Sequence, residues 1–382
     1  MKISDIATVK RGSSPRPIIN YISNKGYPWL KISDFTYGER YVFSTKEYII
    51  EEGLKNTRYV PKGTLIVTNS ASPGIPIFLG KDMCLHDGFL YFENLSNQVV
   101  PMYLYYFILS NRDYLVSQGN GSVFTNLKKE ILENMPIELP EISHQRHIVD
   151  ILGSIDEKIE SNNKIIDKNN AIMRLLFSNF YEKMKLSSET VPIGSLELTV
   201  SDFVANGSFA SLKENVEILD NLSYAYFIRN TDLKAGAFNK FVSEDAYRFL
   251  AKSALYGHEV LISNVGDVGS VFLCPKLNKP MTLGNNMIFI NSKGKDCYNY
   301  YLFFLFSSEE GQYLIRGITG GSAQPKFNKT DFRNIMVYNP SEKLLADFNK
   351  NVEVYLNRNT LCHSENLNLN RLKQLYLKKF FG

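Results

Sequence analysis

The strongest constraint on the fold is a long run of apolar residues spaced alternately by four and three positions. The run extends from Ile148 to Phe180, and no proline interrupts it. This spacing places side chains on one stripe of an α-helix, the pattern of a coiled coil. The stripe consists of Ile148, Leu152, Ile155, Ile159, Asn162, Ile166, Asn169, Met173, Leu176 and Phe180. A helix of about 40 residues would be ~60 Å long and would need a partner along this stripe.

A second stripe near the end of the chain supplies such a partner. It follows Pro340 as the first stripe follows Pro140, with the same spacing but more polar residues. Its positions are Phe348, Val352, Tyr355, Asn359, Cys362, Asn366, Leu369, Lys373, Tyr376 and Phe380. We therefore expect two long helices that pair with each other, in which Ile148, Leu152, Ile155, Ile159, Asn162, Ile166, Asn169, Phe348, Val352 and Tyr355 form the coiled coil or bind a partner.

The segments that precede the two stripes also correspond, which indicates an internal repeat. Residues 29–34 match 226–232, and residues 62–74 match 257–269 with Asn69 over Asn264 and Gly74 over Gly269. In both halves the strand patterns precede an aromatic helix and a glycine-serine break. We expect a strand at residues 3–9. The predicted organisation is a tandem repeat of α/β (α+β) domains at 1–140 and 186–340, each followed by a long helix at 141–185 and 341–382.

The composition is that of a globular protein with few specialised features. Its 382 residues are 44% hydrophobic and 21% charged, enough for two or three domains. No apolar run is long enough to cross a membrane and the N-terminus has no signal-peptide core, so we expect a cytoplasmic protein. The net charge of +4 is only a weak indication of an anionic partner. Residues 1–31 are more informative, because Lys2, Lys10, Arg11, Arg16, Lys25 and Lys31 stand against one acid, Asp5.

In this order, and present twice, these patterns resemble the specificity subunit of type I restriction-modification enzymes. The resemblance covers essentially the whole chain and is carried by residues 29–34, 63–69 and 137–140, and by Pro140 with Gln145, Ile148, Leu152, Ile155, Asp156 and Ile159. It implies two target-recognition domains on an antiparallel helix pair, each reading half of a bipartite site in double-stranded DNA. It also implies methylation subunits, probably two, docked on the helices, with restriction subunits bound through them. S-adenosylmethionine, ATP and Mg would bind only those partners, and this chain would hold no cofactor and no metal. The exit at Pro340 lacks the glutamine and the Ile-Asp pair, which leaves open whether both helices dock partners equally.

Polar residues on the predicted loops are the candidates for DNA contact. Arg and Lys suit guanine or phosphate, whereas Asn and Gln suit adenine. The DNA-binding candidates are Lys10, Arg11, Ser13, Arg16, Lys31, Asn69, Ser72 and Ser122 in the first half, and Arg229, Asn230, Asn264, Asp267, Asn285, Ser322, Gln324 and Lys326 in the second. The alternative for each residue is that it only caps a turn or a helix.

Two further sets of polar residues lie on the first predicted long helix. Asn162 and Asn169 either set the register of the helix pair or face solvent or a docked partner. His144 and His147 lack neighbouring ligands at metal spacing, so we interpret them as helix-surface residues. Asp156 and Lys158 match an Asp-x-Lys pattern, which we attribute to charge pairing on the helix surface.

The sequence shows no catalytic machinery. It contains no G-x-x-x-x-G-K-[ST] phosphate loop, and residues 339–342 lack the second proline and the aromatic residue of an amino-methyltransferase motif. We therefore predict that the chain is not an enzyme but a specificity subunit that directs adenine N6 methylation and restriction by partner subunits at an asymmetric bipartite site. Two rival hypotheses are a coiled-coil adaptor whose globular ends bind proteins, and a stand-alone nuclease or methyltransferase with unrecognised motifs.

Overall fold

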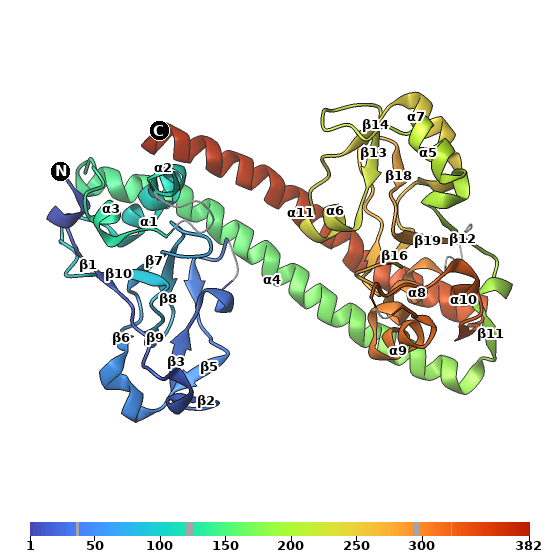
Figure 1. Cartoon of the computed structure of the whole chain (residues 1–382), viewed down its shortest axis with the longest axis horizontal. Coiled ribbons are helices and arrows are strands. Elements are labelled where there is room, and N and C mark those ends of the chain that lie inside the picture. The colour runs from blue at the N-terminus through green and yellow to red at the C-terminus, as the bar shows by residue number, and fades with distance from the viewer. Residues whose placement is uncertain (36–37, 119–125, 293–297, 322) are drawn as a thin grey trace. The chain divides into compact units, whose positions relative to one another are not determined.

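The computed structural model describes residues 1–35, 38–118, 126–292, 298–321 and 323–382 (Figure 1). These residues form two compact units, one consisting of Met1–Asn162 with His363–Gly382 and the other of Asn163–Cys362. Each unit contains a sheet-rich α/β domain and a stretch of both long helices. The predicted α/β fold with two long helices is therefore confirmed.

The described part of the first unit forms two five-stranded sheets. One has the order β1-β10-β7-β8-β4 and the other β2-β5-β3-β9-β6. Neighbouring strands are antiparallel except for the parallel pairs β4 with β8 and β3 with β9. The strands are β1 (Thr8–Arg11), β2 (Ile22–Ser23), β3 (Tyr27–Leu30), β4 (Tyr41–Val42), β5 (Glu47–Ile49), β6 (Arg58–Val60), β7 (Leu65–Thr68), β8 (Pro76–Leu79), β9 (Met83–Leu85) and β10 (Phe89–Glu93). The shorter helices are α1 (Pro101–Ser110), α2 (Arg112–Ser117) and α3 (Lys129–Glu133), with 3₁₀ turns η1 (Ile3–Asp5), η2 (Ile18–Asn20), η3 (Ile32–Asp34) and η4 (Glu51–Asn56).

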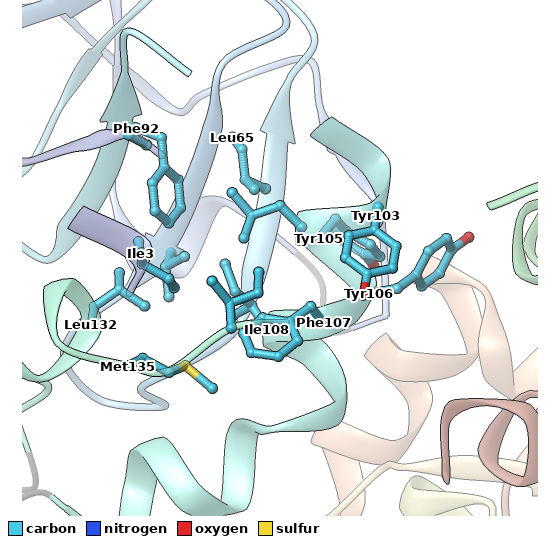
Figure 2. Packing of buried hydrophobic residues seen from close by; sticks show 14 of the residues in the cluster. Ile3, Leu65, Phe92, Tyr103, Tyr105, Tyr106, Phe107, Ile108, Leu132 and Met135 are labelled. Carbon is cyan, nitrogen blue, oxygen red and sulfur yellow. The ribbon is translucent and has the colours of Figure 1, made fainter. Parts of the chain in front are cut away.

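Aromatic residues of α1 fill the main core of the first unit. Figure 2 shows Ile3, Leu132 and Met135 on one side of this cluster and the tyrosines of α1 on the other. The predicted strand at residues 3–9 is wrong in its first half. Residues Ile3–Asp5 form η1, which buries Ile3 completely, and β1 begins only at Thr8. Lys10 and Arg11 consequently lie on a strand.

The second unit repeats this plan with two four-stranded sheets and a separate strand pair. Its described sheets have the orders β12-β19-β16-β17 and β14-β13-β18-β15, and β11 pairs with β20. The connection that carries β4 in the first unit spans residues 35–46, whereas its counterpart spans only residues 236–240. The strands are β11 (Thr190–Pro192), β12 (Leu198–Asp202), β13 (Ala225–Ile228), β14 (Phe241–Val242), β15 (Ala254–Leu255), β16 (Val260–Ser263), β17 (Val271–Leu273), β18 (Met281–Leu283), β19 (Met287–Ser292) and β20 (Met336–Tyr338). The shorter helices are α5 (Phe209–Asn215), α6 (Asn230–Ala235), α7 (Glu244–Phe249), α8 (Asn299–Ser307), α9 (Glu309–Ile318) and α10 (Lys329–Arg333), with 3₁₀ turns η5 (Ile193–Ser195), η6 (Phe203–Asn206) and η7 (Ala251–Ser253).

The two long helices are α4 (Ile142–Ser187) and α11 (Glu342–Phe381). In the first unit Asn162 Nδ2 donates to Glu365 Oε2 and Asn366 Oδ1, both at 2.9 Å. Asp156, earlier in α4, pairs with Lys373, later in α11. The order of the partners shows that the helices are antiparallel. Ile148, Leu152 and Ile155 are buried in the first unit, and Ile159 is half-buried.

The same antiparallel pairing occurs in the second unit. Asn169 Nδ2 donates to Asn359 Oδ1 at 2.8 Å, and the rings of Phe180 and Phe348 stack with their centroids 4.3 Å apart. Ile166 and Val352 are buried, and Tyr355 is half-buried. Asn162 and Asn169 therefore occupy the stripe and bond across it, as expected of residues that set register.

Asp156 corrects the interpretation of the Asp-x-Lys pattern. Its side chain is buried, and its two oxygens accept bonds from Tyr106 Oη and Lys373 Nζ, both at 2.7 Å. The Asp156 carboxylate thus belongs to the core of the first unit and not to a surface charge pair. By contrast, His144 and His147 lie exposed on α4 as predicted. Across the described ranges, no group of His, Cys, Asp and Glu side chains could hold a metal ion, and no helix is long and apolar enough to span a membrane.

Candidate nucleic-acid interface

The two units share one backbone scaffold at the loops where DNA contacts were predicted. The amide of Gly74 donates to Thr68 at 2.8 Å, and the amide of Gly269 donates to Ser263 at 3.0 Å. Each loop contains a residue with positive φ, 58° at Ala71 and 76° at Gly266. These bonds confirm the predicted alignment of residues 62–74 with residues 257–269.

Two more backbone bonds place the same elements together in both units. The carbonyl of Asn69 accepts from the amide of Leu127 at 2.7 Å, and the carbonyl of Asn264 accepts from that of Phe327 at 3.1 Å. The segment after the glycine-serine break therefore lies beside the loop after β7 in one unit and after β16 in the other.

In the first unit the turn after β9 gathers several candidates. The carbonyl of Asp87 accepts from Arg11 Nε at 2.8 Å and from Asn69 Nδ2 at 3.1 Å. Asn69 is only 3% exposed, so it supports this turn and is too deep to reach a base. Gly12 packs so closely that a Cβ there would lie 2.2 Å from the carbonyl oxygen of His86. The Asp87-Gly88 pair is the turn signal by which the sequence marks this position.

The charges of several neighbouring residues act on His86, next to this turn. Burial lowers the pKa of His86, and the carboxylate of Asp87 opposes that shift. The positive charges of Lys31, Arg11 and Arg16 lower the pKa further. Lys31 also contacts Glu47 at 2.7 Å and lies over the ring of Trp29, 5.4 Å from its centroid. Arg11, Arg16 and Lys31 thus form one positively charged cluster that could contact phosphates.

The remaining candidates of the first unit do not join this cluster. Lys10 is on the opposite face of β1 from Arg11, because side chains alternate along a strand, and it pairs with Glu93 at 2.6 Å. Ser13 Oγ donates to the carbonyl of Asn56 at 3.1 Å, so it ties a loop. Ser72 is exposed on the loop after β7. Ser122 lies outside the described residues.

In the second unit the candidates are linked by carboxylates. Arg229 donates two bonds to Asp232, from Nε at 2.9 Å and from a terminal nitrogen at 2.6 Å. Asn230 Nδ2 donates to Asp267 Oδ2 at 2.8 Å. Lys234, then Ser270 and Asn230, hold the pKa of Asp267 down at about 2, so its carboxylate is ionised at neutral pH.

The loop at Asp267 also contacts the segment that contains Lys326. The amide of Gly266 donates to the carbonyl of Pro325, and Lys326 exchanges backbone bonds with Gly320 at 2.9 Å. Gln324 and Lys326 are exposed on this segment. Asn264 Nδ2 donates to the carbonyl of Phe327 at 3.3 Å, which ties the segment to β16. Ser322 lies outside the described residues.

Asn285 borders a cavity of about 380 Å³ in the second unit. Phe203, Phe209 and Phe227 line it together with the amide side chain of Asn264. Phe209 is 79% exposed, a large apolar group on a polar face. The cavity and the bonds from Asn230 and Lys234 to Asp267 had no local signal in the sequence, because they join segments that are distant along the chain.

Comparison with known proteins agrees with this architecture. The family model described as "Type I restriction modification DNA specificity domain" matches residues 1–170 and 197–344. Two relatives from Methanocaldococcus jannaschii are the type I restriction enzyme MjaIX specificity subunit, 24% identical, and the MjaVIII specificity subunit, 22% identical. Each alignment covers 92% of this chain and 85% of the relative.

A solved structure has the same fold. The crystal structure of the type I restriction-modification S subunit from M. genitalium has a TM-score of 0.62 and 16% identity, and the match covers 100% of this chain and 95% of that one. The family model accounts for more than half of the residues, once in each half of the chain. The chain therefore belongs to the type I restriction-modification DNA specificity family and is a specificity component of such a system, not a catalytic one.

Proposed function

We propose that this chain reads an asymmetric, bipartite site in double-stranded DNA, with one half-site for each target-recognition domain. The proposal rests on one observation: the loops after β7 and β16 share the same backbone hydrogen bonds but have different side chains. The same backbone positions present Ser72 in the first unit and Asp267 in the second. Side chains that offer different hydrogen-bond groups select different bases in the major groove.

The DNA-contacting groups divide by charge. The cluster of Arg11, Arg16 and Lys31 supplies phosphate contacts that fix the position of the first domain, and Lys326 has the same role in the second. Carboxylates pair with Arg229 and Lys234 in the second unit. In the first unit Glu47 pairs with Lys31, but Arg11 bonds to a backbone carbonyl. We therefore expect the first domain to contribute more of the salt-dependent affinity.

We infer the partner subunits from membership of the family. The long helices 141–185 and 341–382 dock methylation subunits, two in the complete assembly, and restriction subunits join through them. These partners carry S-adenosylmethionine, ATP and Mg, and they methylate adenine N6 and cut DNA. The domains 1–140 and 186–340 direct them to the site.

A long-read methylome tests this function. Cells that co-express the chain with its methylation subunit are compared with cells that express that subunit alone. We expect a new motif of two different short blocks around a fixed gap, methylated on adenine. A stable complex without new methylation would contradict the proposal and favour the coiled-coil adaptor. Salt-sensitive binding of DNA to the chain would count against the adaptor.

A further inference from the structure

A carboxylate in the second unit is held in a fixed orientation with one oxygen left free. Three donors bond to Asp267, and all of them use the same oxygen, Oδ2. They are Lys234 Nζ at 2.6 Å, Ser270 Oγ at 2.6 Å and Asn230 Nδ2 at 2.8 Å. No residue in the described part of the chain bonds to Oδ1, and the side chain is 46% exposed.

The Asp267 carboxylate is not needed to fold its loop, as comparison with the first unit shows. The equivalent loop of the first unit makes the same backbone bonds with Ser72 in place of Asp267 and with Ile32 in place of Asn230. The loop therefore does not need a carboxylate to form. The second unit has instead added one, together with three groups that orient it.

An ionised carboxylate beside DNA accepts hydrogen bonds and repels phosphates. Its partners on the bases are amino groups, of which cytosine N4 is the one that carboxylates typically recognise in the major groove. Lys234 is half exposed and has further N–H groups, so it can donate to O6 of the paired guanine beside N4. The charge pair then matches the donor and acceptor of one C·G pair.

We propose that Asp267 selects a cytosine at one position of the second half-site, with Oδ1 accepting from N4 and Lys234 contacting the paired guanine. Asn230 and Ser270 are positioning residues that hold the carboxylate. This inference rests on the proposed function, because it names the base that one part of the interface reads.

Selection from a randomised duplex library tests the inference with the full-length chain. The wild-type protein, Asp267→Ser and Asp267→Asn are compared at one salt concentration, after thermal melting has shown which variants are folded. Asp267→Asn keeps the size of the side chain, so it carries the test if Asp267→Ser does not fold. We expect each folded variant to lose about tenfold of the discrimination for cytosine at a single base pair of the second half-site.

Two matched variants separate base reading from loop structure. Ser270→Ala removes one of the three donors to Oδ2 but keeps the carboxylate, so the preference for cytosine should weaken less than in the Asp267 variants. Ser72→Ala changes the equivalent loop position of the first unit and should leave the second half-site unchanged. If the wild type selects a bipartite site and both Asp267 variants select it equally well, the inference is wrong and the proposed function stands. Selection of adenine at that pair would also overturn it. If the wild-type protein selects no DNA site, the inference and the proposed function are both wrong.

Discussion

Arg11 extends from the end of β1 to the turn that carries Asp87, within the positively charged cluster. Replacing Arg11 by Ala should weaken binding to all duplexes about equally and reduce the slope of log affinity against log salt by about one, because one phosphate contact is lost. Titrations with labelled duplexes at several salt concentrations measure this slope. Lys10→Ala is the matched control, since it removes the neighbouring charge on the opposite face of β1. A slope that is the same for Arg11→Ala and wild type would remove Arg11 from the interface.

His86 makes the stability of the first unit depend on pH. Its pKa is lower in the folded protein than the ordinary value of about 6.5, so the unfolded chain binds the proton more readily. The stabilisation is complete above about pH 6.5 and is lost as the pH falls from there through the lower folded pKa. Asp87 opposes this effect, whereas Lys31, Arg11 and Arg16 reinforce it.

Chemical denaturation between pH 5 and pH 7.5 measures the effect of His86. We expect His86→Gln to flatten the decrease in unfolding free energy below pH 6.5. His144→Gln is the control for the loss of an exposed histidine, and the His86→Gln profile is compared with it. Equal profiles for wild type and His86→Gln would show that Asp87 cancels the influence of burial and of the cations.

At the scale of the elements, the helix stripe of the first unit contains a buried charge pair. Lys373 is 12% exposed and Asp156 is 7% exposed in their side chains. Lys373→Ala leaves the Asp156 carboxylate buried without its cation and should destabilise the first unit by about 3–5 kcal/mol. Replacing both residues with apolar ones, Lys373→Met with Asp156→Leu, should cost less, because no unpaired charge remains and only the neutral Tyr106 hydroxyl loses its acceptor. Denaturant unfolding of both variants gives the comparison, and an equal loss in both would contradict the role of the pair.

The stripe shows what a sequence can and cannot predict at this scale. Spacing of four and three is a local signal, so it predicted both long helices and placed Asn162 and Asn169 on the stripe. It left open whether these asparagines bond across the helix pair or face solvent. The partner of Asp156 lies 217 positions away, and no local pattern encodes it. The error at residues 3–9 has a similar cause. Ile3 packs into a core to which α1 contributes several residues, and that tertiary contact overrides the strand pattern.

The candidate interface was predictable in kind but not in detail. Polar and basic loops indicated the segments of the candidate interface. The charges of Arg11, Arg16 and Lys31 all lower the pKa of one residue, His86. The sequence could not separate Lys10 from them, because the start of β1 at Thr8 decides which face each residue takes. It also missed Lys234, since its role depends on Asp267, which follows another strand, and it missed Ser270, which lies three residues after Asp267 in the same loop.

At the scale of the whole molecule, the paired helices join two sheet-rich domains within one chain. Under the proposed function they act as a ruler that sets the gap between the half-sites. Asn162 with Asn366 and Asn169 with Asn359 mark matching positions on the two antiparallel helices. One heptad inserted into α4 between Asn162 and Asn169, and one into α11 between Asn359 and Asn366, preserves the stripe on both helices.

This double insertion lengthens the helix pair by about 10 Å at ~1.5 Å per residue, which is close to three base-pair steps of ~3.4 Å. The methylome of cells with this variant should show the same two half-sites with a gap longer by about three base pairs. A heptad in α4 alone is the control, because it shifts the asparagine partners out of register and should abolish methylation. The half-sites should not change, since no recognition loop is altered. Altered half-sites, or an unchanged gap, would show that the helices do not measure the distance along DNA.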